Sequence, residues 1–245
     1  MNRESAVVPV SVVMPAYNEE GGIETAVAAV QRQVLDRVAG AEAVVVNDGS
    51  RDATGALLDK LAAADPRVRV LHTPNGGHGT ALMRGLAAAR GEYVLLSDSD
   101  NQIPLEGFHP LWAAVQNGAG PGRDGAFGVR LVRHDATFRR ILTVVIRWSL
   151  TLLFGVRIKD ANVPFKLVRR SLWLAARPYI PDGTLAPSLF FAVYLKRTGA
   201  DLAFVDVAHL DRVTGTVSIR RWKLIKFCAR GFRQLLSFRR AIRDL

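Results

Sequence analysis

The chain has 245 residues, a 49% hydrophobic content, a 22% charged content and a formal net charge of +11. These proportions are those of a globular protein and exclude a disordered or collagen-like chain. The single cysteine, Cys228, excludes an internal disulfide and a cysteine-based zinc or iron–sulfur site, and a reducing compartment, the cytoplasm, is expected. We expect no secretory signal at Met1–Pro9 and no membrane span in the apolar run Ile141–Val156, which Arg147 interrupts.

The first hundred residues alternate between short β-rich runs and amphipathic stretches. The predicted strands are Val10–Val13, Ala43–Val46, Val68–Leu71 and Tyr93–Leu96, and the predicted helices are Ile23–Val38, Thr54–Ala64 and Ala81–Arg90. Repeated strand–helix units predict an α/β fold with a mostly parallel sheet. Because the strands are almost continuously apolar, we expect helices on both faces.

The second half of the chain is less regular. Its predicted elements are a strand at Ala126–Val129, an apolar helix at Ile141–Phe154, a helix at Ser188–Arg197 and a strand at Ala203–Val207. The loop Gly118–Gly125 is too short to separate two domains. We therefore expect one domain over residues 1–218, followed by an appended helix over residues 219–245.

Polar segments follow each of the first four predicted strands. They read PAYNEE at 15–20, NDGS at 47–50, NGGHG at 75–79 and DSDNQ at 98–102. Each segment alone is typical of turns and helix caps. Because ligands of parallel sheets bind at the carboxyl ends of the strands, four such segments at one edge favour a binding site.

Two carboxylates in the fourth segment predict a metal site. Asp98 and Asp100 lie two residues apart after a strand, so their side chains can point to the same side. Oxygen ligands suit Mg²⁺ or Mn²⁺, with Gln102 as a further donor. The five histidines are scattered, which argues against zinc. A Walker loop, a GxGxxG after the first strand and a GxSxG elbow are all missing, which disfavours an ordinary ATPase, a dinucleotide dehydrogenase and a serine hydrolase.

Five segments in this order resemble the family-2 glycosyltransferases of GT-A fold, and most of all their dolichyl-phosphate mannosyltransferase and polyprenyl-phosphate glycosyltransferase branch. The segments are VSVVMPAYNEE, VVNDGSRDAT, NGGHGTALMRGL, YVLLSDSDNQ and KDANVPFKLVRR. The resemblance covers roughly residues 8–218. It implies an inverting, metal-dependent transfer of a hexose from a GDP- or UDP-sugar to a polyprenyl or dolichyl phosphate at the inner membrane surface. A separate membrane-embedded partner would then handle the product.

The resemblance also implies roles for single residues. It assigns the Mg²⁺ or Mn²⁺ site to Asp98, Asp100 and Gln102. It assigns the nucleotide sugar to Pro15, Tyr17, Glu19, Asp48, Arg84, Asp98 and Arg212. Catalysis would rest on Asp98 and Asp100, with the acceptor phosphate placed by Arg130 and by Arg139 or Arg140. An ionised phosphate needs cations to position it rather than a strong base.

Two departures from the family pattern leave the identity of the nucleotide and the local backbone of the pocket open. Asn47 stands where a second acid is common, and Pro164 occupies the glycine position of the Gly-Phe-Lys motif. A hydroxyl acceptor would require a carboxylate base, for which Asp160 and Asp182 are candidates, so a family-2 transferase with a sugar or glycan acceptor remains the alternative. A non-catalytic membrane- or nucleic-acid-binding protein on the same scaffold is a third possibility.

Basic residues concentrate near the C-terminus. Nine lie between Ile219 and Arg243 without an acidic residue, whereas the rest of the chain has 24 basic and 22 acidic residues. The segment predicts an amphipathic helix with an apolar stripe made of Trp222, Ile225, Ala229, Phe232 and Leu236. Such a helix is typical of a membrane-surface anchor. A packed helix with a solvated basic face is equally consistent, and the balanced remainder argues against a nucleic-acid partner.

Overall fold

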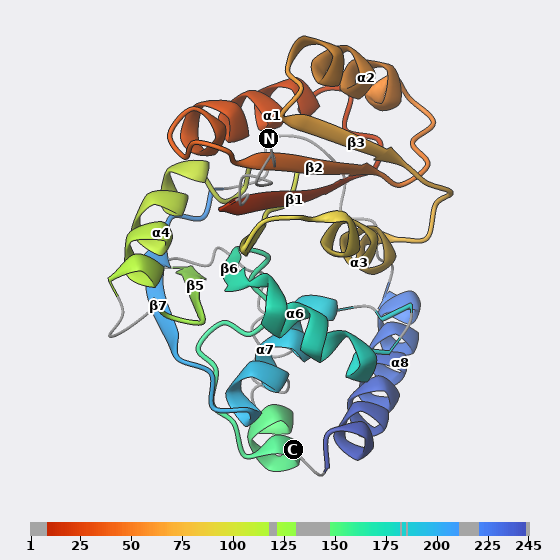
Figure 1. The fold of residues 1–245 in the computed structure, drawn as a ribbon. Helices are drawn as coiled ribbons and strands as arrows, with labels where there is room; N and C mark the ends of the chain where they lie inside the picture. The colour runs from red at the N-terminus through yellow and green to blue at the C-terminus, as the bar shows by residue number, and fades with distance from the viewer. Residues whose placement is uncertain are drawn as a thin grey trace, which may run out of the picture.

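A computed structural model describes residues 9–117, 122–130, 148–181, 183–184, 186–210 and 221–243, without the side chains of 221–229. The described strands form one seven-stranded sheet in the order β3-β2-β1-β4-β6-β5-β7 (Figure 1). Among the described strands, only β6 runs antiparallel to its neighbours. The strands are β1 (Val10–Ala16), β2 (Glu42–Asn47), β3 (Val68–His72), β4 (Tyr93–Leu96), β5 (Gly125–Arg130), β6 (Lys166–Arg169) and β7 (Leu202–Val207).

Helices cover both faces of the sheet. One hydrophobic cluster joins the sheet to α1 (Ile23–Val30), α2 (Thr54–Ala64) and α4 (Phe108–Gln116). A second cluster joins the opposite face to a helix over residues 148–154 and to α3 (His78–Ala88), α6 (Arg170–Ala176), α7 (Pro187–Arg197) and α8 (Arg221–Ala241). Alternate residues of one strand, such as Val12 and Val13, therefore enter different clusters. The mostly parallel, doubly covered α/β architecture expected from the sequence is confirmed.

Several predicted elements need correction. The helix predicted at Ile23–Val38 ends at Val30 and continues as a π-turn, η1 (Gln31–Leu35), and α3 begins at His78 rather than Ala81. Two 3₁₀ turns, η2 (Leu105–Gly107) and η3 (Arg177–Tyr179), were not predicted. Neither were α4, β6 and α6. Strand β6 has only four residues and includes a lysine and an arginine, so its hydrophobic signal is weak. Residues 118–121 of the predicted loop and residues 141–147 of the predicted helix lie outside the described residues.

The described part of the basic helix places two residues of the predicted apolar stripe at the surface and packs other residues on the core. Phe232 and Leu236 are exposed, whereas the buried residues of α8 are Leu235 and Phe238, followed by Ile242 just beyond its end. Phe238 packs against Phe154 and Phe190, with ring centroids 5.8 and 5.0 Å away. The end of α8 thus belongs to the main core, and its exposed apolar side chains lie outside the packed face. Among the described residues, no helix combines the length and the apolar character that crossing a bilayer requires.

A buried carboxylate ties the start of the sheet to the end of α3. Glu42 accepts hydrogen bonds from the Ser11 hydroxyl, the Arg69 guanidinium and the Arg90 backbone N–H, at 2.7 to 2.8 Å. Burial alone would raise the pKa of Glu42, but these hydrogen bonds and the charge of Arg69 outweigh it and lower the pKa. Its stabilising contribution is therefore present at neutral pH and lost as the pH falls through the lowered pKa.

We expect Glu42→Gln to destabilise the fold at pH 7 by about 1 to 3 kcal/mol, the cost of weakening charge-assisted hydrogen bonds. The difference from wild type should shrink as the pH falls below about 4, where the unfolded carboxyl is protonated as well. Urea unfolding at pH 7 and pH 3 measures both values. Equal destabilisation at the two pH values would contradict the role of the carboxylate charge.

Candidate active site

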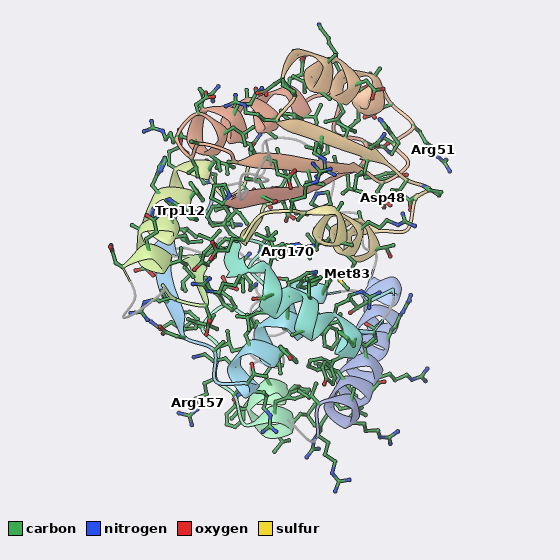
Figure 2. The ribbon with its side chains drawn as sticks, viewed as in Figure 1. Asp48, Arg51, Met83, Trp112, Arg157 and Arg170 are labelled. Atoms are coloured by element: carbon green, nitrogen blue, oxygen red, sulfur yellow. The ribbon has the colours of Figure 1, made fainter. Side chains whose placement is uncertain are left out.

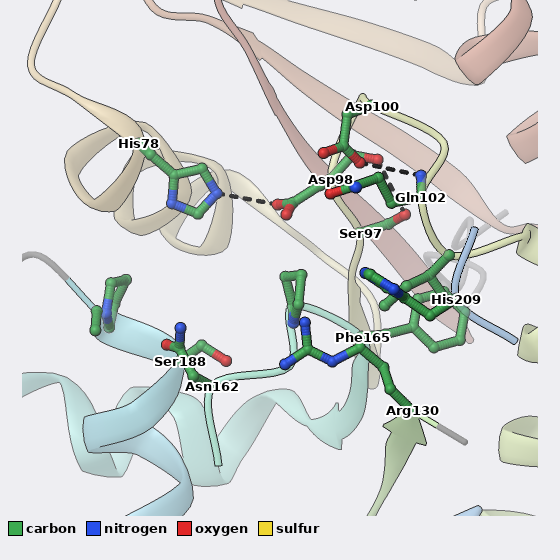
Figure 3. A pocket seen from close by; sticks show the side chains of 14 residues that line it. His78, Ser97, Asp98, Asp100, Gln102, Arg130, Asn162, Phe165, Ser188 and His209 are labelled. Carbon is green, nitrogen blue, oxygen red and sulfur yellow. Dashed lines mark hydrogen bonds and ion pairs between the residues drawn. The ribbon is translucent and has the colours of Figure 1, made fainter. Parts of the chain in front are cut away.

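A cavity lies at the carboxyl edge of the sheet, where the connections from neighbouring strands diverge. Strand β1 pairs with β2 on one side and β4 on the other, which creates a topological switch point. The ends of β5 and β7 reach the same edge as the end of β4, and because β6 is reversed its beginning lies there too. The cavity has a volume of about 230 Å³. The lining residues that carry the argument, all within the described part of the chain, are His78, Asp98, Asp100, Gln102, Arg130, Asn162, Ser188 and His209 (Figure 3).

The DSDNQ segment supplies one side of the cavity. Asp98, Asp100 and Gln102 all line it, and the Asp100 carboxylate accepts a hydrogen bond from the Gln102 backbone N–H at 3.1 Å. Asn101 has a φ of 55°, a left-handed conformation that Asn tolerates better than most residues, and it turns the chain between them. The Gln102 carbonyl accepts a hydrogen bond from the Leu210 N–H at 2.8 Å. The segment is therefore fixed to the chain that leaves β7.

His78 at the start of α3 faces the first of these carboxylates. Its Nε2 lies 3.0 Å from Asp98 Oδ1 (Figure 3). Partial burial lowers the pKa of His78, but the hydrogen bond with Asp98 and the charges of Asp98, Asp100 and Asp48 outweigh it, so the pKa is raised. His78 belongs to the NGGHG segment, but its contact with Asp98 has no signal in the sequence, because the two residues meet only in the fold.

The opposite side of the cavity carries a buried ion pair. Arg130, at the end of β5, donates from Nε to Asp160 Oδ2 at 2.7 Å and from Nη2 to Asp160 Oδ1 at 2.9 Å. Only 14% of the Arg130 side chain and 6% of the Asp160 side chain are exposed. A two-point contact of this kind fixes the plane of the guanidinium. Thirty residues separate the partners, so no local sequence signal could have found the pair.

The NDGS and NGGHG segments form a neighbouring, tightly packed corner. The buried Asp48 carboxylate accepts the backbone N–H groups of Gly76 and Gly77, both at 2.8 Å. Gly49 has a φ of +68°, and a Cβ on it would lie 2.7 Å from the Asn75 nitrogen. This contact requires glycine at position 49. Asp48 thus orders the glycine-rich loop that leads into α3.

Asn47, which stands where the resembled family often has an acid, also has a local partner. Its Nδ2 lies 3.0 Å from His72 Nδ1, and His72 Nε2 lies 2.9 Å from Asp59 Oδ1. Asn47 also accepts the Ser50 N–H at 3.1 Å. A neutral amide can serve the histidine and the loop together. The Asn47 side chain therefore stabilises the end of β2 through these two hydrogen bonds.

The remaining residues expected at the nucleotide lie outside the cavity lining. Pro15 lies in β1, opposite Val46 of β2, and the Tyr17 side chain is exposed. The Glu19 N–H donates a hydrogen bond to Thr54 Oγ1 at 2.8 Å. Arg84 donates to the Pro74 carbonyl at 2.9 Å and lies 3.9 Å from Asp48. The structure thus brings Arg84 to the glycine-rich loop rather than to the cavity. Arg139, Arg140, Asp182 and Arg212 lie outside the described residues.

The chemistry of the donor set suits a hard divalent ion. Asp98 and Asp100 supply two carboxylates and Gln102 an amide oxygen at one cavity wall. The described part of the chain contains no group of three or more His, Cys, Asp or Glu side chains placed to hold a metal. Mg²⁺ is commonly held by only one or two carboxylates, with water and substrate phosphates completing its coordination. These residues therefore fit Mg²⁺ or Mn²⁺.

Comparisons with known proteins agree with this architecture. The profile described as Glycosyl transferase family 2 matches residues 11–172. An undecaprenyl-phosphate 4-deoxy-4-formamido-L-arabinose transferase of Pseudomonas fluorescens is 29% identical over 221 residues, which cover 88% of this chain and 62% of the relative. A prophage bactoprenol glucosyl transferase homolog of Escherichia coli is 28% identical over 232 residues, which cover 94% of this chain and 72% of the relative. This chain thus spans less than two thirds of the length of the Pseudomonas relative.

Solved structures are similar as well. Glucosyl-3-phosphoglycerate synthase of Mycobacterium tuberculosis, in complex with Mn²⁺, UDP and glucosyl-3-phosphoglycerate, superposes with a TM-score of 0.69 at 24% identity. The superposition covers 94% of this chain and 79% of that one. At this identity the likeness supports the fold, which is the GT-A fold. Since the profile matches more than half of the chain, the protein belongs to glycosyl transferase family 2.

Proposed function

We propose that the protein transfers a hexose from a GDP- or UDP-sugar to the phosphate of a polyprenyl phosphate, with inversion at the anomeric carbon. The observation that carries this proposal is the composition of the cavity walls. Asp98 and Asp100 line one side, and the other side presents the Arg130 guanidinium (Figure 3). An arginine suits an anionic acceptor, whereas a hydroxyl acceptor needs a general base. Two relatives with undecaprenyl-phosphate or bactoprenol in their names support the same acceptor class.

The proposed reaction is a direct displacement. An oxygen of the acceptor phosphate forms a bond to the anomeric carbon while the bond from that carbon to the nucleotide diphosphate breaks, which inverts the configuration. His78 and the start of α3 would face the leaving diphosphate, since a helix N-terminus favours anions. Arg130 would hold the attacking phosphate in line. A divalent ion held by Asp98, Asp100 and Gln102 would offset the charge that develops on the diphosphate.

The direct test uses the purified protein with labelled GDP- and UDP-sugars and a polyprenyl phosphate in detergent, with Mg²⁺ or Mn²⁺. We expect a lipid-linked labelled product that requires the metal and loses its label when mild acid cleaves the glycosyl phosphate. Hydrolysis of the donor without a lipid product would contradict the acceptor assignment. The donor that gives the product identifies the nucleotide and the sugar together.

Asp160→Asn separates this proposal from the hydroxyl-acceptor alternative. Both Asp160 oxygens accept hydrogen bonds from Arg130, so the proposal gives Asp160 the task of orienting Arg130. We expect the variant to raise KM for the lipid phosphate about tenfold, the equivalent of one charge-assisted hydrogen bond, while transfer remains measurable. Complete loss of transfer, with donor binding intact, would instead identify Asp160 as a general base.

We further propose that the protein works at the inner membrane surface, where a polyprenyl phosphate resides, and that a membrane-embedded protein receives the product. Residues 1–218 would form the catalytic unit and residues 219–245 the membrane-facing segment. Residues 148–159 and 230–243 form what we call the basic end, where Phe154 packs on Phe238. The basic end has seven basic residues and no acidic one. Arg157 points away from the body of the molecule there (Figure 2).

Exposed apolar side chains accompany these charges. Trp148 is 72% exposed and Leu152 is 82% exposed, one helical turn apart, and Phe232 and Leu236 on α8 are exposed as well. These four are more than half of the large exposed apolar residues in the described part of the chain. A surface that combines aromatic, aliphatic and basic groups suits an anionic bilayer, where each Lys or Arg contributes about 1 kcal/mol.

Vesicle flotation tests this surface. We expect wild type to bind phosphatidylcholine vesicles containing phosphatidylglycerol, and to bind pure phosphatidylcholine at least about tenfold more weakly, because the basic residues contribute only with anionic lipid. Trp148→Ser with Leu152→Ser should weaken binding, whereas Leu174→Ser, a change at an exposed leucine of α6, should not. Equal binding of all variants to both vesicle types would contradict the assignment.

A further inference from the structure

Lys166, the first residue of β6, is a fully buried amine that forms no ion pair with a carboxylate of the described residues. Its side chain is 0% exposed. Its three protons are donated to uncharged acceptors, namely the Ala161 carbonyl at 3.1 Å, the Val163 carbonyl and the Ser188 hydroxyl. The Phe127 ring centroid lies 5.1 Å from Nζ. Lysine is rarely buried in this way, because desolvation of the charge is costly.

The three acceptors belong to two walls of the cavity. Ala161 and Val163 flank Asn162, which lines the cavity, and the same turn begins at Asp160, the partner of Arg130. Ser188 lies in the first turn of α7 and also lines the cavity. Its hydroxyl in turn donates to the Val163 carbonyl at 3.0 Å. A single nitrogen therefore joins β6, the 160–163 turn and α7, and two of the residues at this junction, Asn162 and Ser188, line the cavity.

We infer that Lys166 is a positioning residue for the acceptor phosphate, which acts by holding the 160–163 turn and, through Asp160, the guanidinium of Arg130. The inference rests on the proposed phosphate acceptor. A side chain without the amine would remove the Lys166 hydrogen bonds to the Ala161 and Val163 carbonyls, leaving the Val163 carbonyl with only the Ser188 hydroxyl, and the turn would shift. Displacements of about 1 Å at a reacting group cost about a hundredfold in rate.

Groups at the cavity, together with burial, set the pKa of Lys166. Burial lowers the pKa of Lys166 to about 7, although the negative charge of Asp160 opposes that change; Arg130 lowers it further and Asp98 opposes it. The charged groups that shift the pKa of Lys166 are thus Arg130 and Asp98, which line the cavity, and Asp160, which pairs with Arg130. None of its hydrogen bonds reaches the NDGS or NGGHG segments. Its influence on the nucleotide side should therefore be small.

The alternative is a purely structural lysine, and the two roles differ in what they disturb. A structural role predicts that Lys166→Met weakens donor and acceptor binding together and that its effect adds to that of any other substitution. A positioning role predicts a loss confined to the acceptor, and no further loss once Arg130 has been removed, because the two residues would then act in series.

The experiment measures binding of farnesyl phosphate, GDP and UDP by calorimetry, together with kcat and KM for transfer. The variants are Lys166→Met, Arg130→Met, their combination and Ser188→Ala, with Lys196→Met as the matched control. Lys196 also lies 5.1 Å from a phenylalanine ring, that of Phe204, but does not line the cavity. Thermal unfolding of each variant records the structural cost separately.

We expect Lys166→Met to weaken farnesyl phosphate binding at least tenfold and to change nucleotide affinity less than twofold. The double variant should bind no more weakly than Arg130→Met, and Lys196→Met should match wild type. Additive losses, or equal losses for nucleotide and acceptor, would overturn the inference. If Lys166→Met does not fold, Ser188→Ala is the deciding variant. Unchanged affinity of Ser188→Ala for farnesyl phosphate would also overturn the inference. Absence of farnesyl phosphate binding by wild type would overturn the acceptor assignment and the inference together, whereas normal binding by Lys166→Met would overturn the inference alone.

Discussion

Asp100→Ala is expected to lower the rate of sugar transfer by about 10²- to 10³-fold, the range seen when a group that stabilises developing charge is removed. Asp100 lines the cavity beside Asp98 and is held against the Gln102 N–H. Removing one of two carboxylates should also weaken Mn²⁺ binding, because the remaining donors are Asp98 and a neutral amide. Steady-state transfer and calorimetric titration with Mn²⁺ measure the two effects.

Asp59→Ala is the control for this experiment. Asp59 is an exposed aspartate of α2 that contacts His72 outside the cavity, so transfer and Mn²⁺ affinity should stay within about twofold of wild type, as expected for a surface change. If Asp100→Ala kept full transfer activity and full Mn²⁺ affinity, the metal assignment would be wrong, and the donor diphosphate would have to be neutralised by protein groups such as His78.

Arg130→Met is expected to raise KM for the polyprenyl phosphate about a hundredfold. The guanidinium is mostly buried and held at two points by Asp160, so its loss removes charge-assisted hydrogen bonds to the acceptor, each worth about 1.5 to 3 kcal/mol. It also leaves the Asp160 charge buried without this partner. KM for the donor should change little, because the donor would lie against Asp98 and Asp100.

Two further variants make this result specific. Arg130→Lys keeps the charge but not the two-point geometry, so KM should fall between wild type and Arg130→Met. Arg123→Met breaks a surface ion pair with Asp201, 2.7 Å long, and should leave KM unchanged. A hundredfold rise in KM for the donor rather than the acceptor would move Arg130 to the diphosphate side of the reaction.

The part of the fold that the sequence predicted well is the part with strong, local signals. Strands β1, β2 and β4 are mostly apolar runs closely followed by a polar segment, so the sheet and the positions of Asp98 and Asp100 at its edge could be predicted. Strand β6 could not be predicted, because its four residues begin with a lysine that looks solvent-facing in the sequence. That lysine is instead completely buried.

The rest of the site depends on contacts between residues far apart in the chain. Arg130 was expected to hold phosphate, but its pairing with Asp160 requires β5 and β6 to be neighbours. His78 belongs to a segment expected at this edge of the sheet, but its contact with Asp98 depends on how α3 packs on β1 and β2. The glycine at position 79 lets α3 approach the segment before α7 closely, since a side chain there would overlap the Thr184 carbonyl. Such close approaches follow from tertiary structure rather than from local sequence preference.

The reversed direction of β6 has a consequence for how proteins of this design can evolve. The proposed donor residues follow strands that run toward the cavity, whereas Asp160, Asn162 and Lys166 precede or begin a strand that runs away from it. Of the proposed acceptor residues only Arg130 lies at the end of a strand that runs toward the cavity, and the two substrates are contacted by separate stretches of chain. Insertions and substitutions before β6 can change acceptor preference while the register of β1, β2 and β4 stays as it is. Donor and acceptor specificity can therefore diverge independently on one scaffold.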